Sequence, residues 1–158
     1  MPHIHDKYDY VVTAGIVCDG RVLLVRHRKL DEWLAPGGHI ELSEQPLEAL
    51  FREIEEEVGY QPDQLRMLSN EQRPRPIIND GEQLPPPLDI HIHKITDTHW
   101  HIALIYGFET SSPDFTHNPR EHHETRWFGR RDIESIRDEL LPNIYKHALF
   151  ILDLADKQ

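Results

Sequence analysis

Residues 38–60, GHIELSEQPLEALFREIEEEVGY, contain the clearest helical pattern of the chain. Pro46 suits the first turn of a helix, where its missing N–H costs nothing, and Gly59 suits the position after the last turn. Between them, apolar residues recur at steps of three and four: Leu47, Leu50, Phe51, Ile54 and Val58. This spacing predicts an amphipathic helix of about three to four turns with one face in a core.

Three carboxylates share one face of this helix. Glu53, Glu56 and Glu57 fall within about 100° of arc, because they occupy positions i, i+3 and i+4. Like charges at this spacing destabilise a helix and resist joint ionisation, and a divalent cation removes both penalties. A cluster without His or Cys favours Mg²⁺ or Mn²⁺ over Zn²⁺. Gly37 and Gly38 would let backbone carbonyls approach such an ion.

Glu44 and Arg52 offer a charge pair that would brace the loop against the helix. A glutamate-rich amphipathic helix on its own is more often a solvated face, so the glycines and the charge pair are what favour a functional site. Together these features predict metal-assisted attack on a phosphate ester or anhydride.

The stretch resembles the Nudix box, G-x5-E-x7-R-E-U-x-E-E-x-G-U, in which U is apolar or aromatic. Every specified position matches: Gly38, Glu44, Arg52, Glu53, Ile54, Glu56, Glu57, Gly59 and Tyr60. The resemblance implies a Nudix fold of the α/β (α+β) class, a mixed β-sheet sandwiched between α-helices, over a single domain at 1–158. It also implies a hydrolase that cleaves the pyrophosphate linkage of a nucleoside diphosphate joined to another moiety.

The resemblance also assigns roles within the box. Glu53, Glu56 and Glu57 would bind Mg²⁺ or Mn²⁺, with the Gly38 carbonyl as a further ligand. Glu44 and Arg52 would shape the loop. Substrates left open by the resemblance are ADP-ribose-like sugars, dinucleoside polyphosphates and nucleoside triphosphates.

The general base is placed less consistently in this family, sometimes on a box glutamate and sometimes on an acid in a distant loop. Glu121 and Glu124 occupy such a later loop, just before Trp127. We favour Glu121 because it lies farther into the loop, although an ordinary solvated carboxylate is an equal alternative for either residue.

Outward from the helix, strand and loop patterns alternate. Asp19 and Gly20 form a two-residue hairpin turn, and the proline-rich stretch 71–87 indicates a long surface loop. Strands are expected at 10–18, 21–26, 33–35, 65–68, 88–95, 98–109 and 125–128, and further helices at 131–140 and 143–155. This order indicates a layered α/β or α+β domain.

Several residues outside the box are candidates for substrate binding. Arg26, Arg73 and Arg75 would hold phosphates by bidentate contacts, and Trp33 would stack on a base. The remaining candidates are His91, His93 and His101, which with His99 form i, i+2 pairs that each project from one strand face. Such pairs would contact phosphates or a ribose, or bind a transition metal given further ligands, or be ordinary exposed or core histidines.

Composition limits the classes of partner. Lys and Arg total 17 against 28 Asp and Glu, and the net charge of -11 argues against nucleic-acid binding. The single cysteine, Cys18, excludes a disulfide framework and fits a reducing cytosol. No apolar run approaches the ~18 residues of a membrane span, and the polar N-terminus lacks a signal-peptide core. We therefore expect a cytoplasmic protein with a small-molecule nucleotide substrate and no membrane partner.

Two rival functions share the expected fold. A non-enzymatic nucleotide sensor would not need three metal-binding carboxylates, and all three are present here. Isopentenyl diphosphate isomerases use a cysteine motif that does not surround Cys18. Homodimers are frequent in the family, so the resemblance leaves a homodimer open.

Overall fold

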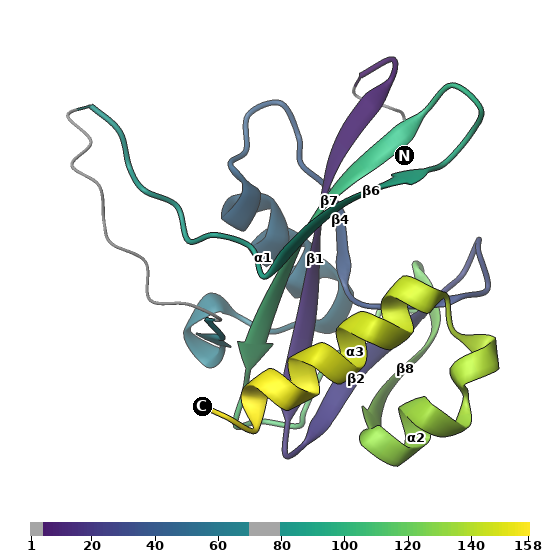
Figure 1. Ribbon diagram of the computed structural model, residues 1–158. Helices are drawn as coiled ribbons and strands as arrows, with labels where there is room; N and C mark the ends of the chain where they lie inside the picture. The colour runs from purple at the N-terminus through teal and green to yellow at the C-terminus, as the bar shows by residue number, and fades with distance from the viewer. Residues whose placement is uncertain (1–4, 70–79) are drawn as a thin grey trace.

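A mixed β-sheet forms the centre of the molecule, with helices on both of its faces (Figure 1). The computed structural model describes residues 5–69 and 80–158. Within these residues, eight strands form one sheet. The mixed sheet sandwiched between helices that the sequence predicted is therefore confirmed.

The longest strands lie side by side in the middle of the sheet. β1 (Tyr8–Cys18) runs parallel to β7 (Trp100–Glu109) along most of its length. On its other edge β1 pairs antiparallel with β2 (Arg21–His27) at the hairpin and with β4 (Gly37–His39) nearer its start. The short strand β4 carries the first residue of the box into the sheet.

Four further strands extend the sheet on both sides. β3 (Trp33–Leu34) and β8 (His122–Gly129) both pair antiparallel with β2. β5 (Arg66–Met67) and β6 (Asp89–Lys94) both pair antiparallel with β7.

Two long helices cover opposite faces of the sheet. In the view of Figure 1, α1 (Pro46–Val58) lies behind β1 and α3 (Pro142–Ala155) crosses in front of it. The shorter α2 (Arg130–Ser135) precedes α3, and two single 3₁₀ turns, η1 (Pro62–Gln64) and η2 (Arg137–Glu139), complete the helical segments of the described chain. None of these helices combines the length and apolar character that a membrane span requires.

Both ends of α1 are capped. The side chain of Gln45 accepts a hydrogen bond of 3.0 Å from the Leu47 N–H, and the Glu48 carboxylate accepts one of 3.0 Å from the Gln45 N–H. Glutamine is not a preferred N-cap residue, yet it performs the role here. Gly59 follows the last turn with φ 79°, a left-handed conformation that favours glycine.

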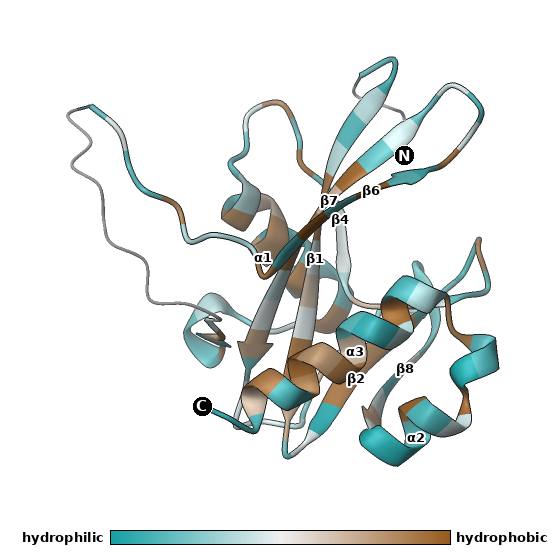
Figure 2. Ribbon diagram, viewed as in Figure 1, coloured by the Kyte–Doolittle hydropathy of each residue, from teal (hydrophilic) through white to brown (hydrophobic). Residues whose placement is uncertain are grey.

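Alternation along the strands builds a separate core on each face. The core on the face covered by α1, the α1 face, contains Val12, Leu50 and Ile54. The core on the opposite face, the α3 face, contains Val11 and Ile151. In Figure 2, β1 and β7 are teal and white at their upper ends and brown where they pass between the helices.

Two elements differ from the expectations. The strand expected at 33–35 ends at Leu34 as β3, but an unexpected strand, β4, follows at Gly37–His39, because backbone pairing with β1 does not need strand-forming side chains. The helix expected at 131–140 is divided into α2 and η2 at Ile136. Of the proline-rich stretch 71–87, residues 71–79 lie outside the described residues, and 80–87 form no helix or strand.

Candidate active site

The site is formed where β4 approaches the middle of α1. A Cβ atom at Gly38 would overlap the carboxylate of Glu53, so any larger residue at this position would have to displace that carboxylate. Glu53 itself is 3% exposed. The backbone of Gly38 and the carboxylate of Glu53 are thus in direct contact, although they are far apart in the sequence.

Arg52 joins the loop, the strand and the carboxylate. Its Nε and Nη2 donate to the two carboxylate oxygens of Glu44 at 2.6 and 2.9 Å. Nη2 also donates to the carbonyl of His39 at 3.1 Å, and Nη1 donates to Glu53 Oε1 at 2.7 Å. This is the bracing that the sequence predicted for Glu44 and Arg52, and such bidentate pairs fix geometry well.

Glu57 lies on the same face of α1 and is also buried, at 5% exposure. Its Oε2 accepts a hydrogen bond of 3.0 Å from the Gly37 N–H. His122 on β8 places Nε2 3.3 Å from Glu57 Oε1. Two strands therefore hold this carboxylate in place.

Glu56 is more exposed than its two neighbours, with 52% of its side chain accessible. Arg52 Nη1 lies 3.8 Å from Glu56 Oε2. Asn118 donates to the Glu56 carbonyl at 2.9 Å, which fastens the 118–121 turn to the end of α1.

Burial disfavours the charged form of the two inner carboxylates. It raises the pKa of Glu53 to about 7, against the opposing effect of Arg52. Burial likewise raises the pKa of Glu57, against the opposing effects of His122 and the Gly37 N–H. A cation bound between these carboxylates would supply the compensating charge that the protein only partly provides.

The donors present fit a hard divalent cation. Glu53, Glu56 and Glu57 on α1 offer carboxylate oxygens, and the missing side chain of Gly38 leaves its backbone accessible beside Glu53. Mg²⁺ and Mn²⁺ both accept such an all-oxygen set.

Glu121 lies beside this cluster. One ligand atom from each of Glu57, Glu121 and His122 lies within 4.8 Å of the other two. Asn118 Nδ2 also approaches Glu121 Oε1 at 3.4 Å. Glu124, the rival candidate, is exposed on β8 opposite Arg26 and does not belong to that group.

His122 was not singled out from the sequence as a site residue. It is buried at 1% exposure between Glu57 and the ring of His27, whose centroid is 6.2 Å away. In the sequence, the only signal for His122 as a site residue is its position next to Glu121. Its contact with Glu57 depends on how β8 pairs with β2, which local sequence does not determine.

Two candidates for substrate binding lie away from the cluster. Arg26 is engaged in a two-point ion pair with Asp31 at 2.8 and 3.2 Å. Trp33 is 5% exposed and packs edge-to-face on Phe128 in the core of the α3 face, which leaves little of its ring for a base. Arg73 and Arg75 lie outside the described residues.

The histidine candidates lie on the other side of the sheet. His91 on β6 pairs with Ala103, a residue of the core on the α3 face, and His93 pairs with His101. The sheet therefore separates His91, His93 and His101 from the carboxylates on α1. The expectation that they contact substrate phosphates has no support from their position.

A cavity of about 500 Å³ opens next to the box loop on the α1 face. Tyr10, Ile40, Leu42, Ile90 and Leu104 contribute to its largely apolar lining. Sequence reasoning missed these residues. The signal was in the alternation of β6, which turns its histidines to one face and its isoleucines to the other.

Fold and carboxylate arrangement together define a Nudix-type domain. A family model described as the NUDIX domain matches residues 9–148, and the chain therefore belongs to the NUDIX domain family. It is a family of hydrolases that act on pyrophosphate bonds.

Individual relatives agree with this assignment. An RNA pyrophosphohydrolase of Halorhodospira halophila is 47% identical over 71 residues, which are 43% of this chain but only 39% of that protein. An RNA pyrophosphohydrolase of Erythrobacter litoralis is 29% identical over 130 residues, 78% of each chain. Among solved structures, a NUDIX-family hydrolase from Clostridium perfringens has a TM-score of 0.77 at 28% identity, covering 93% of this chain and 97% of its own.

Proposed function

We propose that this chain hydrolyses the pyrophosphate linkage of a nucleoside diphosphate joined to another moiety, in a reaction that depends on Mg²⁺ or Mn²⁺. The observation that carries the proposal is the burial of two box carboxylates where β4 meets α1. Glu53 lies against Gly38, and Glu57 accepts a hydrogen bond from the Gly37 N–H. Glutamate is rarely buried without a charge partner, and Glu56 lies on the same helix within one turn of both.

Glu53, Glu56, Glu57 and the Gly38 carbonyl would hold the cation. When bound there, Mg²⁺ or Mn²⁺ neutralises phosphate oxygens and lowers the pKa of the attacking water. Arg52 keeps Glu53 in its orientation through the hydrogen bond of 2.7 Å.

Glu121 would act as the general base. It is exposed at the edge of the cluster, where water and substrate have access, and it lies close to Glu57 and His122. Glu121 would accept one proton of the attacking water as its oxygen bonds to one phosphorus. The bridging P–O bond would break, and the other phosphoryl group would leave with the bridging oxygen.

The apolar cavity supports a substrate with a flat or apolar group beyond its phosphates. Its volume of about 500 Å³ is in the usual range of small-molecule sites. Tyr10, which is 49% exposed, offers a ring for stacking on a base.

A substrate panel with the purified chain tests the proposal. The panel contains ADP-ribose, a dinucleoside polyphosphate, nucleoside triphosphates and, because several relatives are named RNA pyrophosphohydrolases, a short 5′-triphosphorylated RNA. The net charge of -11 opposes a long nucleic acid, so we expect the small nucleotides to be turned over faster.

Turnover is expected with Mg²⁺ or Mn²⁺ and its loss is expected with excess EDTA. Products identified by mass spectrometry show which P–O–P linkage is cut. Nucleotide binding without turnover of any substrate under either metal would refute the proposal and favour a sensor on the same fold.

A further inference from the structure

Histidines that the proposed hydrolysis does not use gather on the α3 face. They come from β4, β6, β7 and the turn before β7: His39, His91, His93, His99 and His101. Strand register explains the gathering, because both His93 and Asp9 lie opposite His101. The centroid of the His101 ring lies 4.8 Å from that of His39 and 5.5 Å from those of His93 and His99.

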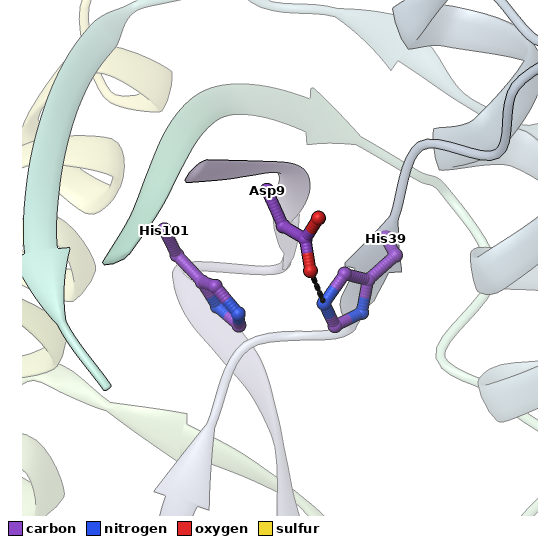
Figure 3. A group of neighbouring side chains, drawn as sticks. All are labelled: Asp9, His39 and His101. Carbon is purple, nitrogen blue, oxygen red and sulfur yellow. Dashed lines mark ion pairs between the residues drawn. The ribbon is translucent and has the colours of Figure 1, made fainter. Parts of the chain in front are cut away.

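Asp9 adds a fully buried carboxylate, at 0% exposure, to this group. Its Oδ2 lies 3.4 Å from His39 Nε2 and 3.2 Å from His99 Nε2. One ligand atom from each of Asp9, His39 and His101 lies within 4.8 Å of the other two. Figure 3 shows these three side chains converging from β1, β4 and β7.

His99 borders this group from the turn before β7. Its Nδ1 lies 3.2 Å from the carbonyl oxygen of Asp6. A carbonyl only accepts, so Nδ1 carries the hydrogen and Nε2 faces the Asp9 carboxylate.

The separation between Asp9 and His39 suits a tetrahedral ion. Two donors that each lie about 2.0–2.1 Å from Zn²⁺ are about 3.3 Å apart at the tetrahedral angle. Asp9 Oδ2 lies 3.4 Å from His39 Nε2, close to this value, and the ligand atom of His101 lies within 4.8 Å of both. Imidazoles with one carboxylate are a donor set for zinc and similar transition metals, whereas Mg²⁺ prefers oxygen donors alone.

We propose that Asp9, His39 and His101 form a second metal site, one that takes a divalent transition-metal ion of the Zn²⁺ class. The ion would be structural, because it would join three strands around a fully buried carboxylate. It would fasten β1, β4 and β7 to one another on the α3 face. Since β4 also carries Gly38 on its other side, the ion would hold the strand that approaches the box carboxylates.

The sequence alone argued against such a site because two-histidine pairs lack further ligands. The structure brings two of them, Asp9 and His39, from segments distant from β7. A second group on this face, Asp89 with His91 and His147, is less enclosed, since 45% of the Asp89 side chain is exposed. Substitution within this second group therefore serves as the control that shows where the ion binds.

Cobalt titration of the EDTA-stripped full chain tests the proposal. Excess Mg²⁺ keeps the box carboxylates occupied, and Co²⁺ reports its donors through visible absorption. We expect one tightly bound Co²⁺ per chain with the intense bands of a four-coordinate site, and displacement of it by Zn²⁺. Zn²⁺ should also raise the Tm of the stripped protein, because an ion that binds only the folded state stabilises it.

Variants locate the site. His101→Gln and His39→Gln should each lower the Co²⁺ affinity at least tenfold and remove the Tm increase. His147→Gln, in the second group, and His123→Gln, on an exposed residue, should change neither. Circular dichroism checks folding, and His39→Gln serves if His101→Gln does not fold.

Absence of four-coordinate Co²⁺ bands in the wild-type chain would overturn the proposal. Loss of binding in His147→Gln but not in His101→Gln would move the ion to the second group and overturn it too. Neither result depends on hydrolysis, so Glu57→Gln should retain the Co²⁺ bands whatever its activity.

Discussion

At the scale of single residues, Glu57 has the most constrained carboxylate of the proposed cation site. Glu57→Gln keeps the shape and the hydrogen bond from the Gly37 N–H but removes the negative charge. We expect kcat with Mg²⁺ to fall about 100-fold or more, because cation binding supplies several kcal/mol to such reactions. Glu55→Gln, an exposed change on the same helix, should leave kcat unchanged. Wild-type rates in Glu57→Gln would contradict the assignment.

A second pair of substitutions tests whether Glu121, and not Glu124, is the general base. Glu121→Gln should lower kcat about 10²–10⁴-fold with little change in KM, because a general base acts in the transition state rather than in substrate binding. Glu124→Gln should behave as the wild type, since that side chain lies on β8 opposite Arg26. Steady-state kinetics on the best substrate of the panel measure both. Equal effects of the two substitutions would remove Glu121 from the role.

Residues of the box were predictable, and their partners on distant strands were not. Glu53 and Glu57 follow from spacing on one helix, because i and i+4 positions share a face, and the pairing of Arg52 with Glu44 was also predicted. His122 and Asp9 reach their neighbours only through strand pairing between distant segments, which depends on register and not on local pattern.

At the scale of elements, the meeting of β4 with α1 determines whether the site can form. A methyl group at Gly38 would overlap the Glu53 carboxylate, so Gly38→Ala must displace Glu53 or separate the strand from the helix. We expect a loss of about 1–3 kcal/mol in the free energy of unfolding, as for other overpacked positions, together with loss of turnover. Urea unfolding and kinetics measure the two effects.

Gly20→Ala is the matched control for Gly38→Ala. Gly20 has φ 69° in the hairpin turn but nothing within 4 Å of an added Cβ. Its substitution should lower stability by about 1–2 kcal/mol through backbone strain and leave turnover intact. Equal turnover in Gly38→Ala and the wild type would show that the contact with Glu53 is dispensable.

The same comparison shows which elements the sequence predicts well. Helix α1 was predicted with its observed limits, because apolar periodicity and both terminal residues are local signals. Strand β4 was missed, because two glycines give no strand signal and only pairing with β1 makes them extended. Short elements of this kind are where the proposed chemistry depends most on tertiary contacts.

At the scale of the whole molecule, the sheet separates two sets of possible metal ligands with different chemistry. Carboxylates on the α1 face suit a hard cation, and imidazoles with Asp9 on the α3 face suit a softer one. The net charge of -11 favours cations at both. Strand alternation alone produces this separation, because neighbouring residues such as Gly38 and His39 point to opposite faces.

Stability of the whole fold should depend on pH through Glu44. The hydrogen bond from Arg52 lowers the pKa of Glu44 below its ordinary value of 4.5. A carboxyl whose pKa is lowered by folding contributes stability above its unfolded pKa, and this contribution is lost as the pH falls through the lowered folded value. Glu44→Gln should therefore cost about 1–3 kcal/mol at pH 7, as for hydrogen bonds to charged groups, and progressively less below pH ~4.5.

Urea unfolding of the wild type and Glu44→Gln between pH 3 and 8 measures this difference directly. Glu55→Gln, on an exposed residue, should show no comparable difference at any pH. If the difference in the free energy of unfolding between the wild type and Glu44→Gln stays constant down to pH 3, the charge of Glu44 does not contribute to stability. The bracing of the box loop would then rest on the remaining contacts of Arg52 with Glu53 and the His39 carbonyl.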